Sequence, residues 1–262
     1  MRDITVLGNK VTDLTTAELL AEVDAIIARG ASEVILNTNV HGINLAQRLP
    51  WLKAYRNSIR VTHADGAGIA LGARLLGYRM GPRVCINDFI WDLARYCREH
   101  DRSVFLLGAA PDVVTRAAAA LKAREPNVRI AGIHNGYFAK QGPENDRVVA
   151  LINEARPNIL LVGFGMPVQE QWVRDNVHRL NANVIMVVGG FFDRLSGEVP
   201  WTPRWMTENG LEWVYLSLRR PRRFFDRYLI GNPKFLIQVL LERFGLLNGS
   251  SRYDPPPQGS RS

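Results

Sequence analysis

The sequence predicts an α/β fold in which crossover helices cover a mostly parallel sheet. Short aliphatic and β-branched runs, such as residues 34–36 and 104–107, alternate with longer runs in which apolar residues recur at helical spacing. Parallel strands need long connections, which helices supply, so this alternation is typical of a doubly wound, Rossmann-like sheet. With 47% hydrophobic residues, the 262-residue chain can form the core of one large domain or two small ones.

The elements follow from local signals taken in chain order. A capping-box pattern, Thr15-x-x-Glu18, begins the first amphipathic helix, which stops at Gly30. Buried strands are predicted at residues 34–36, 59–62, 104–107, 128–133, 159–162 and 184–188. Helices are predicted at residues 40–49, 68–76, 88–99, 111–122, 146–154 and 168–178. These strand–helix units fill residues 1–195, which we interpret as one Rossmann-like α/β domain.

The pattern changes after residue 195. Residues 219–243 contain seven basic and two acidic residues, interleaved with aromatic and aliphatic ones. We interpret residues 196–247 as a basic, aromatic, helical C-terminal appendage suited to an anionic surface, either a membrane face or a polyphosphate. A basic helix packed on its own core has the same composition, so both interpretations stay open. Residues 248–262 are rich in Gly, Ser and Pro, and we expect them to be disordered.

Composition and spacing argue against several classes of protein. Cys85 and Cys97 are the two cysteines and neither lies in a C-x-x-C, so we expect reduced thiols without a disulfide framework. We expect a soluble or peripheral protein, because we find no secretory signal and no apolar run of about 20 residues. The net charge of +8 comes without a nucleic-acid-binding motif, so no nucleic acid partner is expected. His41, His63 and His134 fit no compact ligand spacing, and no metal site is predicted.

Small and polar residues follow nearly every predicted strand. Ligands of open α/β sheets bind outside the carboxyl ends of the strands, so these residues form a binding cleft by composition. Asp65 stands out because Gly66 and Gly68 beside it leave room for a ligand. Asp65 can act as a general base toward a hydroxyl group, or it can cap the helix that begins near Gly66, and spacing leaves both open. Gly163-x-Gly165 lacks the third glycine of a dinucleotide site, which disfavours a nicotinamide cofactor.

Several motifs occur in a fixed order along residues 34–228. They are Asn37-Thr38-Asn39 with His41-Gly42, Ala64-Asp65-Gly66, Gly108, Gly136-Tyr137-Phe138, Gly163-x-Gly165-x-Pro167-x-Gln169-Glu170, Gly189-x-Phe191-x-Asp193-x-x-Ser196-Gly197, Gly210-Leu211-Glu212-Trp213-x-Tyr215, Pro221-x-Arg223 and Arg227-Tyr228. In this order they resemble the WecG/TagA/CpsF glycosyltransferase family (glycosyltransferase family 26).

The resemblance implies a GT-E-like fold and an inverting, metal-independent hexosyltransferase that needs no cofactor. Such an enzyme moves a sugar from a UDP donor to a polyprenyl-diphosphate-linked acceptor at the cytoplasmic membrane face, in cell-surface polysaccharide biosynthesis. The sugar stays open among N-acetylmannosamine, its uronic acid and glucose. By resemblance, residues 1–195 are the catalytic domain and the appendage docks on the anionic membrane.

The resemblance also assigns roles to residues. Asp65 is the catalytic base that takes the proton of the acceptor hydroxyl. Donor-sugar and acceptor contacts are implied for Thr38, Asn39, Arg83 and Gln169. Nucleotide and diphosphate contacts are implied for Gly108, Tyr137, Asp193, Arg223 and Arg227.

Three positions depart from the family pattern: Val168 where lysine is usual, Asn87 where glycine is usual, and Leu216 where arginine is usual. Arg219 or Arg220 is a candidate replacement for the arginine missing at 216. The departures keep an alternative open, a non-catalytic nucleotide-binding or membrane-docking protein with a decayed site. The sequence leaves the oligomeric state open, a homo-oligomer included.

Overall fold

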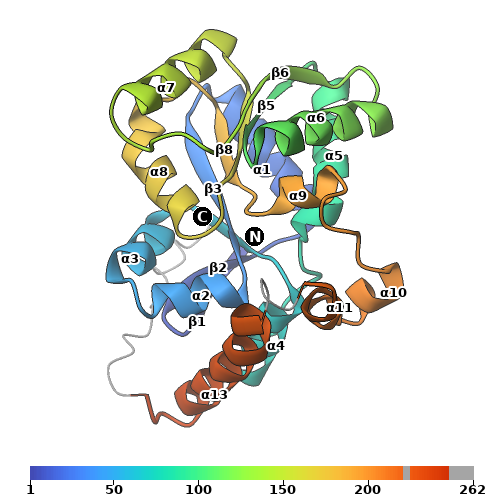
Figure 1. Cartoon of the computed structure of the whole chain (residues 1–262). Helices are drawn as coiled ribbons and strands as arrows, with labels where there is room; N and C mark the ends of the chain where they lie inside the picture. Colours follow the sequence, from blue (N-terminus) through green and yellow to red (C-terminus); the bar gives the residue numbers. More distant parts are fainter. Residues whose placement is uncertain (221–224, 248–262) are drawn as a thin grey trace, which may run out of the picture. The chain divides into compact units, whose positions relative to one another are not determined.

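The computed structural model describes residues 1–220 and 225–247, and over this part of the chain eight strands alternate with helices (Figure 1). The α/β class predicted from the sequence is confirmed. Strands β1 (Arg2–Val6) and β2 (Asn9–Asp13) pair antiparallel, whereas five further strand pairs are parallel. The described residues divide into two compact units: unit 1 holds Met1–Thr15, Thr38–Val84 and the described residues from Thr202 to residue 247, and unit 2 holds Thr16–Asn37 and Cys85–Trp201.

Unit 2 contains the parallel strands in the order β3-β8-β7-β5-β6. Strands β5 and β7 are buried along their whole length, as expected for parallel strands covered on both faces. The strands are β3 (Glu33–Thr38), whose last residue Thr38 belongs to unit 1, β5 (Ser103–Gly108), β6 (Arg129–His134), β7 (Ile159–Gly163) and β8 (Val184–Val187). The helices are α1 (Thr16–Ala28), α5 (Ile86–Glu99), α6 (Pro111–Arg124), α7 (Pro143–Ala155), α8 (Val168–Asn176), the 3₁₀ turn η1 (Val177–Arg179) and α9 (Phe191–Leu195).

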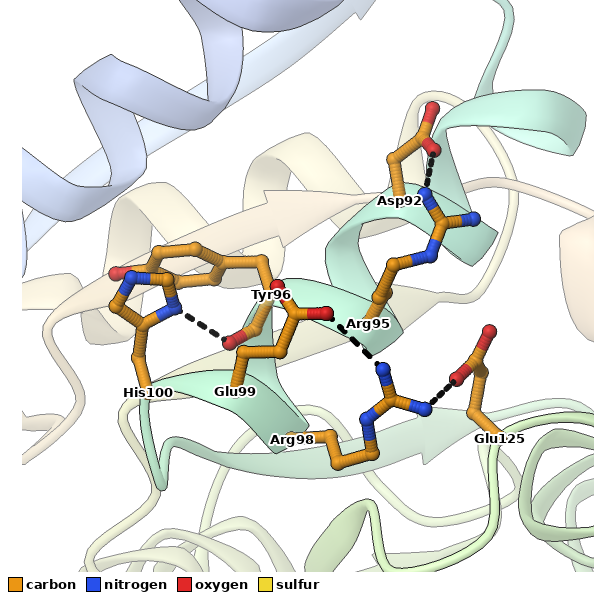
Figure 2. A network of polar contacts seen from close by, with 7 residues as sticks. All are labelled: Asp92, Arg95, Tyr96, Arg98, Glu99, His100 and Glu125. Atoms are coloured by element: carbon orange, nitrogen blue, oxygen red, sulfur yellow. Dashed lines mark hydrogen bonds and ion pairs between the residues drawn. The ribbon is translucent and has the colours of Figure 1, made fainter.

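Helix α5 illustrates how the crossover helices are built. Its apolar stripe, which includes Phe89, Leu93 and Cys97, is buried at helical spacing. Its outer face carries a polar network, in which the Arg98 guanidinium donates to Glu99 and to Glu125, both at 3.0 Å (Figure 2). Exposed ion pairs of this kind contribute at most about 1 kcal/mol each, so the buried stripe holds α5 in place and the network orders its surface.

Unit 1 begins with the hairpin of β1 (Arg2–Val6) and β2 (Asn9–Asp13), and β2 pairs in parallel with β4 (Val61–Ala64). Its helices are α2 (Val40–Ala46), α3 (Pro50–Ser58), α4 (Ala67–Leu75), α10 (Arg204–Glu208), α11 (Glu212–Arg219), the π-helical segment η2 (Phe225–Ile230) and α13 (Gly231–Arg243). Side chains from β1, β2, α2, α4 and α13 share one apolar core.

Helix α13 packs into this core through one face. Phe235 and Val239 are buried, and a Cβ added at Gly72 of α4 would lie 2.6 Å from the Phe235 ring (Figure 1 shows α13 beside α4). The Glu242 carboxylate accepts a hydrogen bond from the Leu7 amide at 2.9 Å. The opposite face of α13 exposes Ile237. The buried face fits the interpretation of a helix packed on its own core, and docking on an anionic surface stays a prediction.

The division into a catalytic domain at residues 1–195 and a docking appendage at residues 196–247 stays a prediction. The expectation of disorder falls on residues 248–262, outside the described residues. Among the helices that the structure describes, none is both long and apolar enough to cross a bilayer.

The hairpin and helix α3 were missed in the sequence. The hairpin turns at Leu7 and Gly8, whose φ angles are 52° and 68°. Such a turn normally has Asn-Gly, so a leucine in the left-handed region gives no signal. Helix α3 had a usable signal in Pro50 in its first turn, but Arg56 stands on its buried face and interrupts the apolar pattern.

Replacing Phe235 by alanine should destabilise the protein by about 3–5 kcal/mol, because the variant leaves a cavity against Gly72. Chemical denaturation followed by circular dichroism measures the change. Ile237→Ala on the same helix is the matched control, since this side chain is 57% exposed. Equal stabilities of the two variants would show that α13 is not part of the unit 1 core.

Candidate active site

Two predicted site residues lie together where β3 and β4 end. The backbone amide of Asp65 donates to the carbonyl of Thr38 at 2.7 Å. Thr38 is fully buried, whereas Asp65 is partly exposed. The N-cap of α4 is Gly66, so Asp65 lies one residue before the cap instead of occupying it. The carboxylate is therefore carried by the residue between the end of β4 and the N-cap of α4, on backbone that the neighbouring strand end fixes.

The two glycines after Asp65 are needed for different reasons. Gly66 has a φ of 99°, which glycine adopts at little cost, and no atom lies within 4 Å of where its Cβ would be. A Cβ at Gly68 would lie 2.5 Å from a methyl group of Val40. We expected both glycines to leave room for a ligand. Gly66 has open space, but Gly68 is required by the packing of α4 on α2.

The side chains of Asn39 and Arg83 both form hydrogen bonds with backbone groups of unit 1. The Asn39 side-chain oxygen accepts from the Gly42 amide at 2.9 Å and caps α2. Only its amide nitrogen stands outside this cap. The Arg83 guanidinium donates to the carbonyl of Thr207, which ties the chain before α5 to α10 within unit 1. Both residues shape the loops near the strand ends of unit 1.

The C-terminal arginines are only partly described. Arg227 is partly exposed, with its guanidinium 5.2 Å from the centre of the Tyr228 ring, and Arg223 lies outside the described residues. Leu216, where the family pattern has arginine, is 2% exposed. Of the two candidate replacements, Arg219 is exposed and its guanidinium lies 5.4 Å from the centre of the Tyr215 ring.

Arg56, His41 and His63 belong to unit 1 together with the ends of β3 and β4. Arg56 is 1% exposed and donates from Nη2 to the Thr38 hydroxyl at 2.6 Å. The pKa of His63 is lowered to about 4, chiefly because the ring is buried and in part because the Arg56 charge is near. The pKa of His41 is also lowered to about 4, by burial first and then by the charges of Arg227 and Arg48. Both imidazoles are therefore neutral at pH 7.

The strand ends of unit 2 hold the other predicted residues. A Cβ at Gly108 would lie 2.3 Å from the Gly163 carbonyl oxygen. The close approach of β5 to β7 is therefore sufficient to require glycine at this position. Tyr137 is 79% exposed. Lys140 holds the loop that bears Tyr137, because its ammonium donates to the carbonyls of Gly136 at 2.7 Å and Phe138 at 2.9 Å.

Gln169 and Asp193 are placed differently from each other. Gln169 is buried; its side-chain oxygen accepts from the Gly189 amide at 3.0 Å, which joins the start of α8 to the loop after β8. Asp193 lies in the first turn of α9 and is partly exposed.

Val168 is 45% exposed and lines a cavity of about 340 Å³. The cavity is bounded by Ala139, Lys140, Gln141, Val168, Gln171, Trp172 and Asp175.

The structure thus groups the predicted residues by unit. Unit 1 holds Thr38, Asn39, Asp65, Arg83 and Arg227, and unit 2 holds Gly108, Tyr137, Gln169 and Asp193. Within residues 1–220 and 225–247, no three His, Cys, Asp or Glu side chains gather as a metal site would require. Cys85 and Cys97 are free and buried.

Arg56 and Lys140 were not predicted from the sequence, although their side chains hydrogen-bond at or beside predicted site residues. Arginine and lysine are usually solvated, so neither residue type predicts burial. For Arg56 a signal exists in its position one turn after Leu52 on the face of α3 that turns inward.

Comparison with known proteins agrees with the resemblance. Residues 4–249 match the Glycosyl transferase WecG/TagA/CpsF family, and the chain belongs to that family. It is 30% identical over 178 residues to the N-acetylglucosaminyldiphosphoundecaprenol N-acetyl-beta-D-mannosaminyltransferase of Bacillus subtilis (strain 168), covering 68% of this chain and 67% of the relative. The enzymes of the same name from Bacillus spizizenii (strain ATCC 23059 / NRRL B-14472 / W23) and Staphylococcus aureus (strain NCTC 8325 / PS 47) are 29% and 26% identical, with 81% and 82% of this chain and 79% and 84% of the relatives covered.

His63 should make stability depend on pH. Its pKa is about 4 when folded against an ordinary 6.5, so the unfolded chain binds the proton first and stability falls as pH decreases from about 6.5 toward 4. In His63→Gln the slope of unfolding free energy against pH between 7 and 5 should be smaller, by at most about 1.4 kcal/mol per pH unit. Urea titrations at several pH values measure it. His178→Gln, at an exposed histidine, is the control, and an unchanged slope in His63→Gln would contradict the assignment.

Proposed function

We propose that this protein transfers N-acetylmannosamine from a UDP donor to N-acetylglucosamine linked through diphosphate to undecaprenol, with inversion at the anomeric carbon and with Asp65 as base. The names of the relatives support the sugar and the acceptor. The observation that carries the proposal is the position of Asp65 at the end of β4, partly exposed, with its amide held by Thr38. The uronic acid and glucose are the donor sugars against which N-acetylmannosamine is tested.

The proposed reaction is a single displacement. The acceptor hydroxyl attacks the anomeric carbon, its proton passes to the Asp65 carboxylate, and the bond from that carbon to the UDP oxygen breaks. UDP leaves with increased negative charge on its diphosphate. Guanidinium groups suit a diphosphate because they remain charged and can donate two parallel hydrogen bonds. We assign this role to Arg227 and Arg223, without a metal ion, and contacts to the donor to Arg83 and Asn39.

In unit 2, Tyr137 and Asp193 are the proposed nucleotide contacts. Tyr137 offers an exposed ring on a loop that Lys140 fixes, which suits stacking against a flat base. Gln169 and Gly108 contribute by shaping the strand ends, since the Gln169 side chain is buried and Gly108 is needed for the approach of β7.

We further propose that the exposed face of α13 docks on the cytoplasmic face of the cell membrane, where a polyprenyl acceptor resides. Ile237, Leu240 and Phe244 are 57%, 42% and 72% exposed, and Lys234 and Arg243 are basic residues of the same helix. An apolar face with basic residues beside it is the pattern of a helix that lies in the interface of an anionic bilayer.

Asp65→Asn should lower kcat by about 10²–10⁴-fold, because the amide cannot accept the proton, while UDP-sugar binding stays within about twofold. UDP release is measured with UDP-N-acetylmannosamine, its uronic acid and UDP-glucose, each with a short prenyl-diphosphate-linked N-acetylglucosamine. Asp112→Asn, at a carboxylate 67% exposed in α6, should keep full activity.

Turnover by Asp65→Asn equal to that of the wild type would show that Asp65 is not the base.

The second candidate function, a nucleotide-binding protein without activity, is favoured by the buried Leu216 at the position of a family arginine. Binding of UDP-sugars without release of UDP by the wild-type protein, over all three donors, would establish it in place of the transferase.

Replacing Ile237, Leu240 and Phe244 by serine together should weaken binding to vesicles of phosphatidylglycerol and phosphatidylcholine by at least about tenfold, because three apolar side chains lose their burial in the bilayer. Sedimentation of the vesicles measures the bound fraction. Leu151→Ser, at a leucine 41% exposed on α7, is the control. Point variants are used because truncation of α13 would also remove Phe235 from the core, and unchanged binding would refute the docking face.

A further inference from the structure

We propose that Arg56 is a positioning residue for Asp65, acting through Thr38. This inference rests on the proposed role of Asp65 and deepens it. No motif of the family resemblance includes Arg56, which lies in α3 and is 1% exposed.

The burial of Arg56 needs a compensating interaction. Taking a guanidinium out of water is expensive unless hydrogen bonds satisfy it. Leu52, one turn earlier on the same helix, fills the inner face of α3 with an apolar side chain at no such cost. Arg56 instead directs a charged donor to the Thr38 hydroxyl at 2.6 Å, and both residues are buried. A charge-assisted bond of this length is among the stronger hydrogen bonds in a protein.

Thr38 connects the arginine to the carboxylate. Because arginine can only donate, the bond from Arg56 fixes the Thr38 oxygen as its acceptor and holds the side chain in one rotamer. The carbonyl of the same residue accepts the Asp65 amide at 2.7 Å. Two hydrogen bonds therefore link α3 to the end of β3 and the end of β3 to Asp65. Displacing a base by about 1 Å can lower the rate about 10²-fold, so a small shift of Asp65 after loss of these bonds would be measurable in kcat.

The surroundings of the guanidinium favour this arrangement. His63, two residues before Asp65 in β4, is close enough for the Arg56 charge to help lower its pKa, and the ring is neutral at pH 7. A neutral ring leaves Arg56 without a competing positive charge from β4. His63 therefore adds no positive charge beside the buried guanidinium at pH 7.

The first test compares Arg56→Met, Arg56→Lys, Thr38→Val and the double variant Arg56→Met with Thr38→Val. We expect kcat to fall about 10–100-fold in Arg56→Met and in Thr38→Val, with KM for the UDP-sugar within about twofold. The double variant should be no slower than either single one, because all three lose the same bond. Arg56→Lys should recover part of the rate. A lower melting temperature with unchanged kcat would make Arg56 merely structural and overturn the proposal.

The second test does not depend on activity. Hydrogen exchange of backbone amides, followed by NMR on the full chain, should show the Asp65 amide exchanging at least about tenfold faster in Arg56→Met, while the Gly189 amide bonded to Gln169 is unchanged. Should Arg56→Met fail to fold, Thr38→Val and Arg56→Lys supply the same comparison. Unchanged Asp65 protection overturns the proposal even in an active enzyme. If the wild-type protein releases no UDP, the proposed function is refuted. The hydrogen-exchange result alone then decides whether Arg56 positions Asp65.

Discussion

The hydrogen bond from the Asp65 amide to the Thr38 carbonyl is the interaction on which the account of unit 1 depends. It joins the ends of β3 and β4 at the point where a helix begins after each strand. Thr38 is buried and Asp65 is partly exposed, so one partner of the bond is fixed by the interior and the other can meet a ligand. In the proposed reaction, a carboxylate carried by such a backbone would need little reorganisation when an acceptor binds, which is the advantage of a site built on rigid elements.

The sequence predicted the class of fold and most of the strands, because these depend on local patterns, whereas the role of Asp65 stays a prediction. Apolar runs give the strands, and Asp65 follows one of them directly. It did not predict which contacts require each glycine. Gly68 is required by Val40 and Gly108 by the Gly163 carbonyl, and both contacts come from residues distant along the chain. The hairpin was missed for a related reason, since the positive φ of Leu7 is imposed by pairing between strands rather than by leucine itself.

Helix α13 shows why charge composition alone left two interpretations of the C-terminal segment. A helix can bury Phe235 in its own core and expose Ile237 two residues later, and a count of basic residues cannot separate these faces. Its buried face makes α13 part of unit 1, and its other face exposes Ile237 and Leu240. The same element thus stabilises the unit that bears Asp65 and carries the face that we propose for docking at a membrane.

The most direct measurement for the central claim is an experimental structure of the Asp65→Asn variant with UDP-N-acetylmannosamine and a prenyl-diphosphate-linked acceptor bound. The account predicts the acceptor hydroxyl within about 2.6–3.2 Å of the residue 65 side chain and in line with the bond to the departing UDP oxygen. A side chain at position 65 that points away from the anomeric carbon, with another group on the hydroxyl, would contradict it.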